Sequence, residues 1–175
     1  MAHGNDSPVF LIGYRGTGKS TVARELAAKL EFDAADSDVV VENEAGKTLA
    51  QIFAEDGEPA FRELEARAVT ALSGKRRMVV SLGGGAVLRE SNLEVIRRAG
   101  PVVWLTASVD TILDRVNRDE TTAHRRPNLT VAGGRAEIEE LLAVRTPLYR
   151  ECATLTVDTE GKTAAEIADE IVARL

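Results

Sequence analysis

The stretch GYRGTGKST, residues 13–21, decides the fold class. It has the form G-x-x-x-x-G-K-[ST], in which the backbone N–H groups of a glycine-rich loop surround the phosphates of a nucleoside triphosphate. An apolar run, Val9–Ile12, precedes it and an amphipathic stretch, residues 17–30, follows it. These neighbours predict the strand and helix that flank such a loop. Lys19 is placed to reach the terminal phosphates and the Ser20 hydroxyl to bind Mg²⁺.

Length and composition limit the class of protein. The chain has 175 residues, 44% of them hydrophobic, and a formal net charge of -6. We expect a single domain, residues 8–175, behind a flexible N-terminal tail, residues 1–7. The acidic balance argues against nucleic-acid and anionic-membrane partners, and no apolar run approaches the roughly 18 residues of a membrane span. The single cysteine, Cys152, cannot form an internal disulfide, so we expect a cytoplasmic protein and, from its size, a monomer.

Beyond the loop, short apolar runs alternate with amphipathic stretches, which is typical of an α/β fold with a parallel sheet. Ser108 and Thr163 precede two such stretches as predicted helix N-caps. The last helix is expected over residues 164–175. Strands are predicted over residues 9–12, 32–35, 78–82, 102–105 and 154–157.

One segment breaks this alternation. Residues 118–135, RDETTAHRRPNLTVAGGR, are polar and have no apolar period. A long loop inside a compact domain is usually a functional lid or a disordered segment. We therefore expect a mobile lid over about 118–135.

Other classes of nucleotide-binding protein fit less well. A switch GTPase carries an Asn-Lys-x-Asp segment that reads guanine, and this chain has none. Its Asp-x-x-Gly match, residues 158–161, follows the last predicted strand, which is the wrong place. A motor ATPase is larger. The sequence therefore favours a kinase of small molecules.

Two carboxylates follow the second predicted strand, in Asp36-Ser37-Asp38. In a parallel sheet this strand end and the phosphate loop open into the same crevice. The third strand leads into Gly83 rather than an aspartate, so Asp36 can take the role of orienting Mg²⁺. If the segment is extended, Asp38 points elsewhere, toward an acceptor hydroxyl. An exposed loop or a pair of helix caps is the alternative.

The class of acceptor follows from glycines and arginines. Gly83, Gly84 and Gly85 remove three side chains from the crevice wall, so that a ligand can contact backbone. Arg62 and Arg145 supply forked guanidinium groups of the kind that hold a carboxylate bidentately. Each could instead serve in an ordinary surface ion pair, and sequence spacing alone does not bring the two together.

Six segments together resemble the shikimate kinase family: GYRGTGKST, DSD, GEPAFRELE, SLGGGAVL, RRPNL and VRTPLYRECA. The resemblance extends over about residues 9–175. It implies a P-loop fold of the nucleoside-monophosphate-kinase type, with a five-stranded parallel sheet of order 2-3-1-4-5, flanking helices and a mobile lid. It also implies that ATP phosphorylates the 3-hydroxyl of shikimate, giving ADP and shikimate 3-phosphate.

The resemblance also implies roles for individual residues. Asp38, Lys19 and Arg126 would be catalytic, with Asp38 as the candidate base and Arg126, or its neighbour Arg125, on the transferring phosphate. Arg62 and Arg145 would hold the carboxylate of shikimate, with backbone contacts from Gly84 and Gly85. Mg²⁺ would be held by Ser20 and, through water, by Asp36. The ATP-binding residues would be Gly16, Thr17, Gly18, Lys19, Ser20, Thr21, Arg115 against adenine, Arg126, and Lys162 at the edge of the adenine site.

The sequence departs from the family pattern in the lid, where Asn128 stands in place of a common leucine. Trp104 is expected in the core rather than in the substrate site. Two other functions share the same scaffold: a kinase of another small hydroxy acid such as gluconate, and a catalytically silent regulatory module that binds nucleotide. The full set of charged site residues favours the shikimate reaction.

Overall fold

The computed structural model describes residues 6–119 and 133–175. Its centre is a parallel sheet of order β2-β3-β1-β4-β5, as predicted. Phe32 and Thr154, expected to begin strands, lie just before β2 and β5, so those two predicted strands were one residue early. The strands are β1 (Val9–Ile12), β2 (Asp33–Asp36), β3 (Met78–Ser81), β4 (Val102–Thr106) and β5 (Leu155–Asp158).

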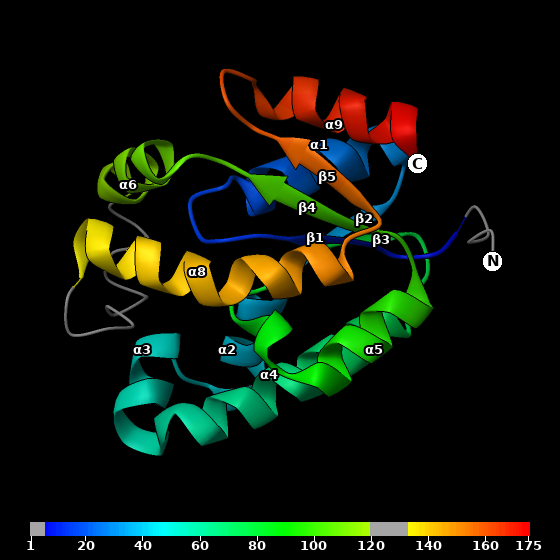
Figure 1. Cartoon of the computed structure of the whole chain (residues 1–175). Coiled ribbons are helices and arrows are strands. Elements are labelled where there is room, and N and C mark those ends of the chain that lie inside the picture. Colours follow the sequence, from blue (N-terminus) through cyan, green and yellow to red (C-terminus); the bar gives the residue numbers. More distant parts are fainter. Residues whose placement is uncertain (1–5, 120–132) are drawn as a thin grey trace.

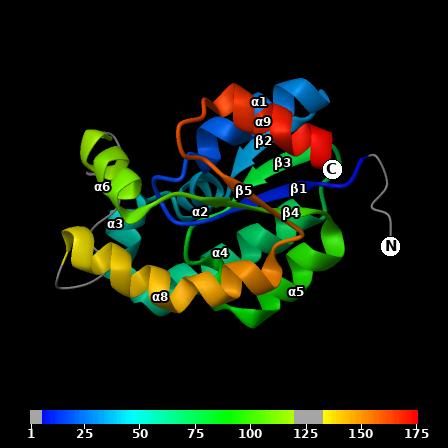
Figure 2. The same ribbon diagram turned by 45° about the horizontal axis from the view of Figure 1, so that its top comes forward.

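Helices cover both faces of the sheet, with α1 and α9 on one side and α4, α5 and α8 on the other (Figures 1 and 2). None of the helices in the described residues combines the length and hydropathy needed to cross a membrane. The helices are α1 (Lys19–Leu30), α2 (Ser37–Ala45), α3 (Leu49–Gln51), α4 (Gly57–Ser73), α5 (Glu90–Ala99), α6 (Val109–Arg118), α8 (Gly134–Cys152) and α9 (Ala164–Arg174), with a π-helical turn at Ile52–Asp56 and a 3₁₀ turn at Ala86–Leu88.

The central strands are buried from both sides, which explains their continuous apolar sequences. Leu11 packs with Leu26 and Ile167 on the α1/α9 side, and Phe10 with Tyr149 on the other. Cys152 belongs to the second cluster, as expected of a structural cysteine. Burial raises the pKa of its thiol to about 11, which makes it a poor nucleophile at neutral pH.

The ends of the expected lid are helical. Arg118 is the last residue of α6 and Arg135 lies in the first turn of α8, so the predicted loop was too long at both ends. Ion pairs on the helix surface account for this: Arg118 pairs with Asp114 one turn earlier, and Arg135 pairs with Asp110 and Glu139. The rest of the expected lid, residues 120–132, lies outside the described residues.

The two predicted helix caps are present. The Ser108 side chain accepts a hydrogen bond from the Thr111 N–H at the start of α6, and Thr163 forms a capping box with Glu166 at the start of α9. Trp104 packs against the core and stacks on Tyr149, as expected. Asp6, which we placed in a flexible tail, accepts the backbone N–H of Arg77 at 2.7 Å and pairs with Arg76.

Gly100 controls how β1 enters the sheet. A Cβ built on Gly100 would lie 1.9 Å from the Pro8 carbonyl oxygen, which is backbone and cannot rotate away. We expect Gly100→Ala to lower the free energy of unfolding by about 1–3 kcal/mol, measured by chemical denaturation. Gly74→Ala is the matched control, since its Cβ would lie 3.7 Å from the nearest atom. Equal effects from the two substitutions would contradict this packing argument.

Candidate functional site

The loop after β1 has the backbone shape that phosphate binding requires. Gly13, Gly16 and Gly18 have φ values of 140°, 81° and 88°, as their places in the motif predict. At Gly13 the constraint is also steric, because a Cβ would lie 2.5 Å from the Leu105 carbonyl oxygen. The loop therefore presses against the end of β4 and opens toward the N-terminus of α1, where unpaired N–H groups favour anions.

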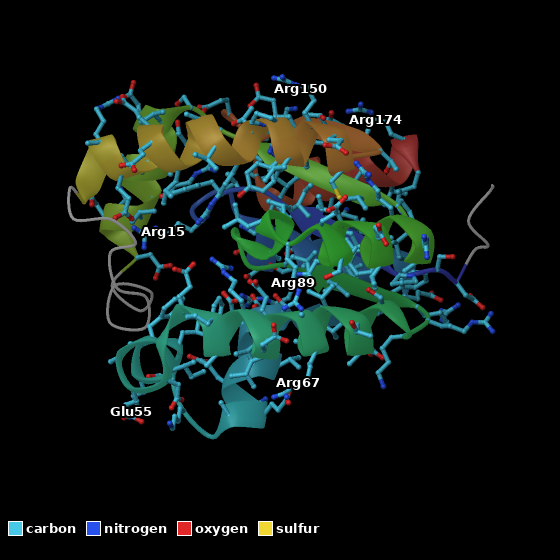
Figure 3. The ribbon with its side chains drawn as sticks, turned by 60° about the horizontal axis from the view of Figure 1, so that its bottom comes forward. Arg15, Glu55, Arg67, Arg89, Arg150 and Arg174 are labelled. Atoms are coloured by element: carbon cyan, nitrogen blue, oxygen red, sulfur yellow. The ribbon has the colours of Figure 1, made fainter. Side chains whose placement is uncertain are left out.

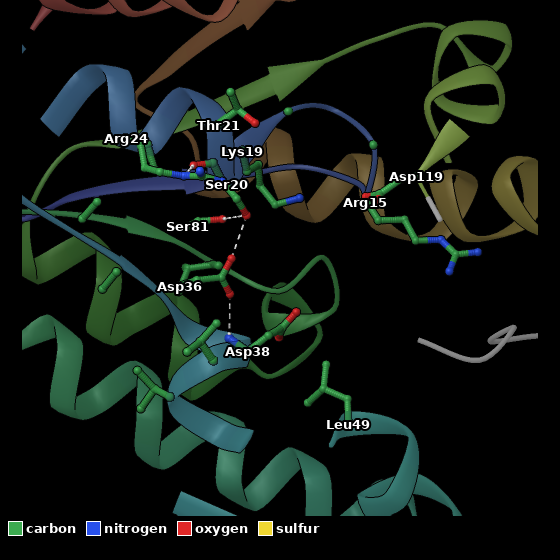
Figure 4. A pocket seen from close by; sticks show the side chains of 18 of the residues that line it. Arg15, Lys19, Ser20, Thr21, Arg24, Asp36, Asp38, Leu49, Ser81 and Asp119 are labelled. Carbon is green, nitrogen blue, oxygen red and sulfur yellow. Dashed lines mark hydrogen bonds between the residues drawn. The ribbon is translucent and has the colours of Figure 1, made fainter. Parts of the chain in front are cut away.

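A cavity of about 730 Å³, the larger pocket, extends from this loop across the ends of β2 and β3 (Figure 4). Gly16, Gly18 and Ser20 line its loop side. Arg115 lines the side toward α6, where its guanidinium donates to the Gly16 carbonyl at 3.2 Å and to the Thr159 hydroxyl at 3.1 Å. The predicted phosphate loop and the predicted adenine-side arginine thus share one cavity.

Lys19 points into the loop itself in this structure. Its Nζ donates to the carbonyl oxygens of Gly13, at 2.7 Å, and Tyr14, at 2.9 Å, and the residue is only 8% exposed. Both carbonyls are acceptors that a phosphate oxygen can replace. The ammonium group is therefore held within the loop, close to where a phosphate would bind.

Oxygen atoms that could bind a metal ion lie together at the floor of the larger pocket. The Ser20 hydroxyl donates to Asp36 Oδ2 at 2.7 Å and lies 3.4 Å from the Ser81 hydroxyl (Figure 4). Hydroxyl and carboxylate oxygens are the ligands that Mg²⁺ prefers, together with phosphate and water. The donor set at Ser20 and Asp36 fits the metal role predicted for it.

Asp38 does not lie on an extended segment, so that part of the prediction was wrong. It lies in the first turn of α2, and Asp36 caps this helix by accepting the Asp38 N–H at 2.9 Å. A capping aspartate at a strand end starts a helix at once, because its carboxylate satisfies a free N–H of the first turn. The two carboxylates still have separate surroundings: Asp36 faces Ser20, whereas Asp38 lies beside Gly83.

A second cavity, the smaller pocket of about 60 Å³, adjoins the first. Arg62 from α4 and Arg145 from α8 both line it, so the two arginines that sequence spacing could not connect do converge. Asp38 lines both pockets and connects them. The remaining lining residues are Arg15, Leu49, Phe53, Phe61, Glu65, Gly83, Gly84 and Gly85.

The three glycines are necessary where they stand. A Cβ on Gly83 would lie 2.7 Å from Asp38 Oδ1, one on Gly84 would lie 3.2 Å from Arg145 Nη1, and one on Gly85 would lie 2.7 Å from both terminal nitrogens of Arg62. Each added methyl group would therefore occupy space next to a charged group. The glycines therefore bring backbone close to the charged side chains of the pocket.

The smaller pocket has an excess of positive charge. Three arginines and two carboxylates line it, in a chain of net charge -6. Arg62 is paired with Glu65 at 2.8 Å and with Glu58 at 3.2 Å. Arg145 is 4% exposed, and no ion pair joins it to a carboxylate of the described residues. A buried guanidinium in this state is suited to an anionic ligand.

Comparison with known proteins agrees with the family resemblance of the sequence. The family model "Shikimate kinase" matches residues 15–175. A shikimate kinase of Rhodopirellula baltica is 43% identical over 164 residues, which cover 94% of this chain and 88% of that protein. The chain belongs to the shikimate kinase family. Its reaction is the ATP-dependent phosphorylation of shikimate.

Solved structures of the family have the same fold. A shikimate kinase from Acinetobacter baumannii in complex with shikimate superposes with a TM-score of 0.90 at 35% identity, over 96% of this chain and 92% of that one. The enzyme from Aquifex aeolicus gives a TM-score of 0.80 at 30% identity, over 95% and 94%. The fold of the nucleoside-monophosphate-kinase type that the sequence implied is therefore confirmed.

Sequence reasoning missed two charged residues of the smaller pocket, Glu65 and Arg15. Glu65 lines the smaller pocket and pairs with Arg62, and burial raises the pKa of its carboxyl group while Arg62 opposes that rise. Arg15 lies between the two pockets and donates to the fully buried Glu137 at 3.0 Å (Figure 3). The spacing of Glu65 three residues after Arg62 was an available signal, whereas the Arg15–Glu137 pair had none.

Some predicted ATP-binding residues lie away from the larger pocket. Lys162 donates to the Asp158 carbonyl and pairs with Glu170 on the surface, and it does not line the cavity. Thr17 is 2% exposed, and its hydroxyl donates to the Tyr14 carbonyl within the loop. Thr21 lines the larger pocket. Arg125, Arg126 and Asn128 lie outside the described residues.

The contact between Gly85 and Arg62 can be tested kinetically. In Gly85→Ala the new methyl group must displace the Arg62 guanidinium, which is the end of a flexible side chain, so folding should be little affected. We expect the KM for shikimate to rise roughly tenfold and the KM for ATP to stay within about twofold. Steady-state kinetics with each substrate varied is the measurement. Equal rises in the two constants would contradict the placement of Arg62, and Gly74→Ala serves as the control.

Proposed function

We propose that this chain transfers the γ-phosphoryl group of ATP to the 3-hydroxyl of shikimate at the junction of its two pockets. The observation that carries the proposal is the position of Asp38. It lines both the larger pocket, with the phosphate loop, and the smaller pocket, with Arg62 and Arg145. An acceptor with a carboxylate at one end and a hydroxyl at the other would span the distance between the arginines and the phosphate.

The carboxylate of shikimate would be bound by Arg62 and Arg145. Both guanidiniums lie against the glycine turn, since added Cβ atoms at Gly85 and Gly84 would contact them. The N–H groups of Gly84 and Gly85 have no hydrogen-bond partner among the described residues. They add two neutral donors beside the two charged ones, which is a favourable surrounding for an anion.

The ATP phosphates would be bound by the backbone of residues 16–21. Lys19 would exchange its bonds with the Gly13 and Tyr14 carbonyls for bonds with phosphate oxygens. Ser20 and, through water, Asp36 would hold Mg²⁺, in keeping with their 2.7 Å contact. When bound, Mg²⁺ neutralises charge on the β- and γ-phosphates. Arg115, with its two contacts to Thr159, would lie against adenine.

In the reaction, the 3-hydroxyl oxygen forms a bond to the γ-phosphorus while the bond to the bridging oxygen of ADP breaks. The hydroxyl proton passes to Asp38, which lies where the two pockets meet. Phosphoryl transfer needs little covalent chemistry from the protein, so alignment and charge neutralisation dominate the rate. Lys19 and Arg126 would supply the positive charge as the phosphoryl group moves.

A different hydroxy acid such as gluconate is the alternative acceptor, because it also offers a carboxylate and hydroxyls. The second alternative function is a catalytically silent regulatory module that binds nucleotide. ADP release by purified protein separates them, with shikimate, gluconate, a nucleoside monophosphate or no acceptor added. We expect release to depend on shikimate. Release that depends on gluconate, or no release with any acceptor, would overturn the proposal.

Replacing either of the two proposed carboxylate-binding arginines should change the KM for the acceptor far more than the KM for ATP. We expect Arg62→Ala and Arg145→Lys each to raise the KM for shikimate by roughly tenfold to a hundredfold, and to change the KM for ATP little. Arg145→Lys keeps the charge but loses the fork that matches a carboxylate.

Arg67→Ala is the matched control for Arg62→Ala. Arg67 lies on the same helix, is exposed and pairs with Glu44, away from both pockets. Its kinetic constants should match those of the unmodified protein. If Arg62→Ala behaves like Arg67→Ala, the proposed carboxylate site is wrong.

A second pair of variants ranks charge stabilisation against proton transfer. An arginine on the transferring phosphate contributes on the order of 10³ to 10⁵ in rate, and a positioned base roughly 10² to 10⁴. We therefore expect Arg126→Ala to lower kcat at least as much as Asp38→Asn, as measured at saturating ATP and shikimate. Near-normal kcat in Arg126→Ala would remove Arg126 from this role, and Arg125→Ala then tests its neighbour.

The proposal includes a cytoplasmic location and action as a monomer, with shikimate and ATP as the partners. Support comes from the small chain of 175 residues and from its single, buried cysteine. The exposed large apolar side chains of the described residues come from four segments, since Val172 and Leu175 both lie at the end of α9; the others are Val39, Leu88 and Val144. Light scattering during size-exclusion chromatography gives the mass in solution, and a dimer at assay concentration would correct this part.

A further inference from the structure

Two buried hydroxyl groups, from α2 and α8, form hydrogen bonds with the backbone of the glycine turn, Gly83–Gly85. The Ser37 hydroxyl, at the start of α2, accepts the Gly83 N–H at 3.0 Å. The Tyr149 phenol, near the end of α8, donates to the Gly84 carbonyl at 2.6 Å. Both residues are 0% exposed, and neither lines either pocket.

The turn needs such contacts because of its composition. Three successive glycines have more backbone freedom than any other sequence, and fixing them costs conformational entropy. A Cβ on Gly83 or Gly85 would lie 2.7 Å from Asp38 Oδ1 or from the Arg62 guanidinium, so a larger residue would displace a charged group of the site. The chain therefore cannot stiffen this turn by substitution, and hydrogen bonds from outside it are the remaining means.

We propose that Ser37 and Tyr149 are positioning residues for the acceptor, which fix the glycine turn so that the Gly84 and Gly85 N–H groups face the bound carboxylate. The inference rests on the proposed function, since it assumes that shikimate occupies the smaller pocket. It adds an indirect role for two side chains that touch neither substrate.

The placement of both residues in the sequence supports this role. Ser37 lies between Asp36 and Asp38, so the segment that addresses the metal and the acceptor also fixes the turn. Tyr149 lies one helical turn after Arg145, and a Cβ on Gly84 would contact both side chains, at 3.5 Å and 3.2 Å. Any shift of the turn would therefore change the distances to Asp38 and Arg145 together.

The phenol is a dependable donor. Burial raises the pKa of Tyr149 to about 12, against a smaller opposing effect of Arg145. The hydroxyl therefore keeps its proton throughout the range in which kinases are assayed. Its ring is also fixed, by stacking on Trp104 with the centroids 5.9 Å apart. Removal of the oxygen alone, as in Tyr149→Phe, leaves this packing in place.

The test compares Tyr149→Phe, Ser37→Ala and the unmodified chain in steady-state kinetics, together with their free energies of unfolding. We expect each variant to raise the KM for shikimate roughly three- to tenfold, the equivalent of one hydrogen bond. The KM for ATP and the kcat should stay within about twofold. Ser37→Ala is independent of the packing of Tyr149, so either variant tests the proposal if the other does not fold.

Thr154→Val is the control for a lost side-chain hydrogen bond. The Thr154 hydroxyl bonds to both backbone groups of Val102 at the β4–β5 edge, away from the pockets. Thr154→Val should lower the free energy of unfolding without raising the KM for shikimate. The inference is overturned if both variants keep a normal KM for shikimate, if the KM for ATP rises equally, or if Thr154→Val has the same kinetic effect. Lack of shikimate-dependent activity in the unmodified chain would instead refute the proposed function.

Discussion

The site depends on the register of three neighbouring parallel strands. Asp36 at the end of β2 is paired with Ser81 of β3, and Ser81 with Leu11 of β1. Adjacent strands lie about 4.8 Å apart, so the three chain segments that leave this row emerge within a side chain's reach of one another. One leads to the phosphate loop, one to the start of α2 and one to the glycine turn. A one-residue slip of any strand would separate Asp36 from Ser20.

Electrostatics then decides what the site accepts. The chain is acidic overall, yet the smaller pocket has three arginines against two carboxylates, and one of those, Glu65, is buried enough that its pKa is raised. Burying Arg145 with no ion pair to a carboxylate of residues 6–119 or 133–175 costs free energy. Binding a monoanion offsets that cost, whereas a neutral sugar would not. In the proposed function, selectivity for an acid comes from this buried guanidinium, which acts on the nearby Glu65 carboxyl group but forms no ion pair within the described residues.

What the sequence could reveal depends on how local each feature is. The phosphate loop and the caps at Ser108 and Thr163 follow from short-range patterns, whereas the sheet order was implied only by the family resemblance; all were predicted. We predicted extended chain at Asp38. An aspartate after a strand is compatible with both a loop and a helix cap, and the local sequence does not decide between them. Here the Asp36 carboxylate accepts the Asp38 N–H at 2.9 Å, and this bond starts the helix.

Long-range contacts were beyond any such pattern. Arg62 and Arg145 lie on helices that are far apart in the sequence, and only the packing of α4 and α8 against the same sheet face brings them together. The pair of Arg15 with the buried Glu137 is of the same kind. Sequence composition suggested a carboxylate site because of the residue types, but the meeting of those residues is a property of the fold.

The geometry also separates the parts of the molecule that affect affinity from those that affect rate. The carboxylate of the acceptor and its arginines do not change charge during phosphoryl transfer, so their interaction is nearly equal in the ground and transition states. Such binding can raise kcat only by fixing the orientation of the hydroxyl. In the proposed mechanism, the groups that meet newly formed charge, Lys19 at the phosphates and Asp38 at the proton, act on kcat directly. The glycine turn lies between these two sets, because it contacts Arg62 and Arg145 on one side and Asp38 on the other. Fixing this turn would therefore convert binding at one end of the acceptor into alignment at the other.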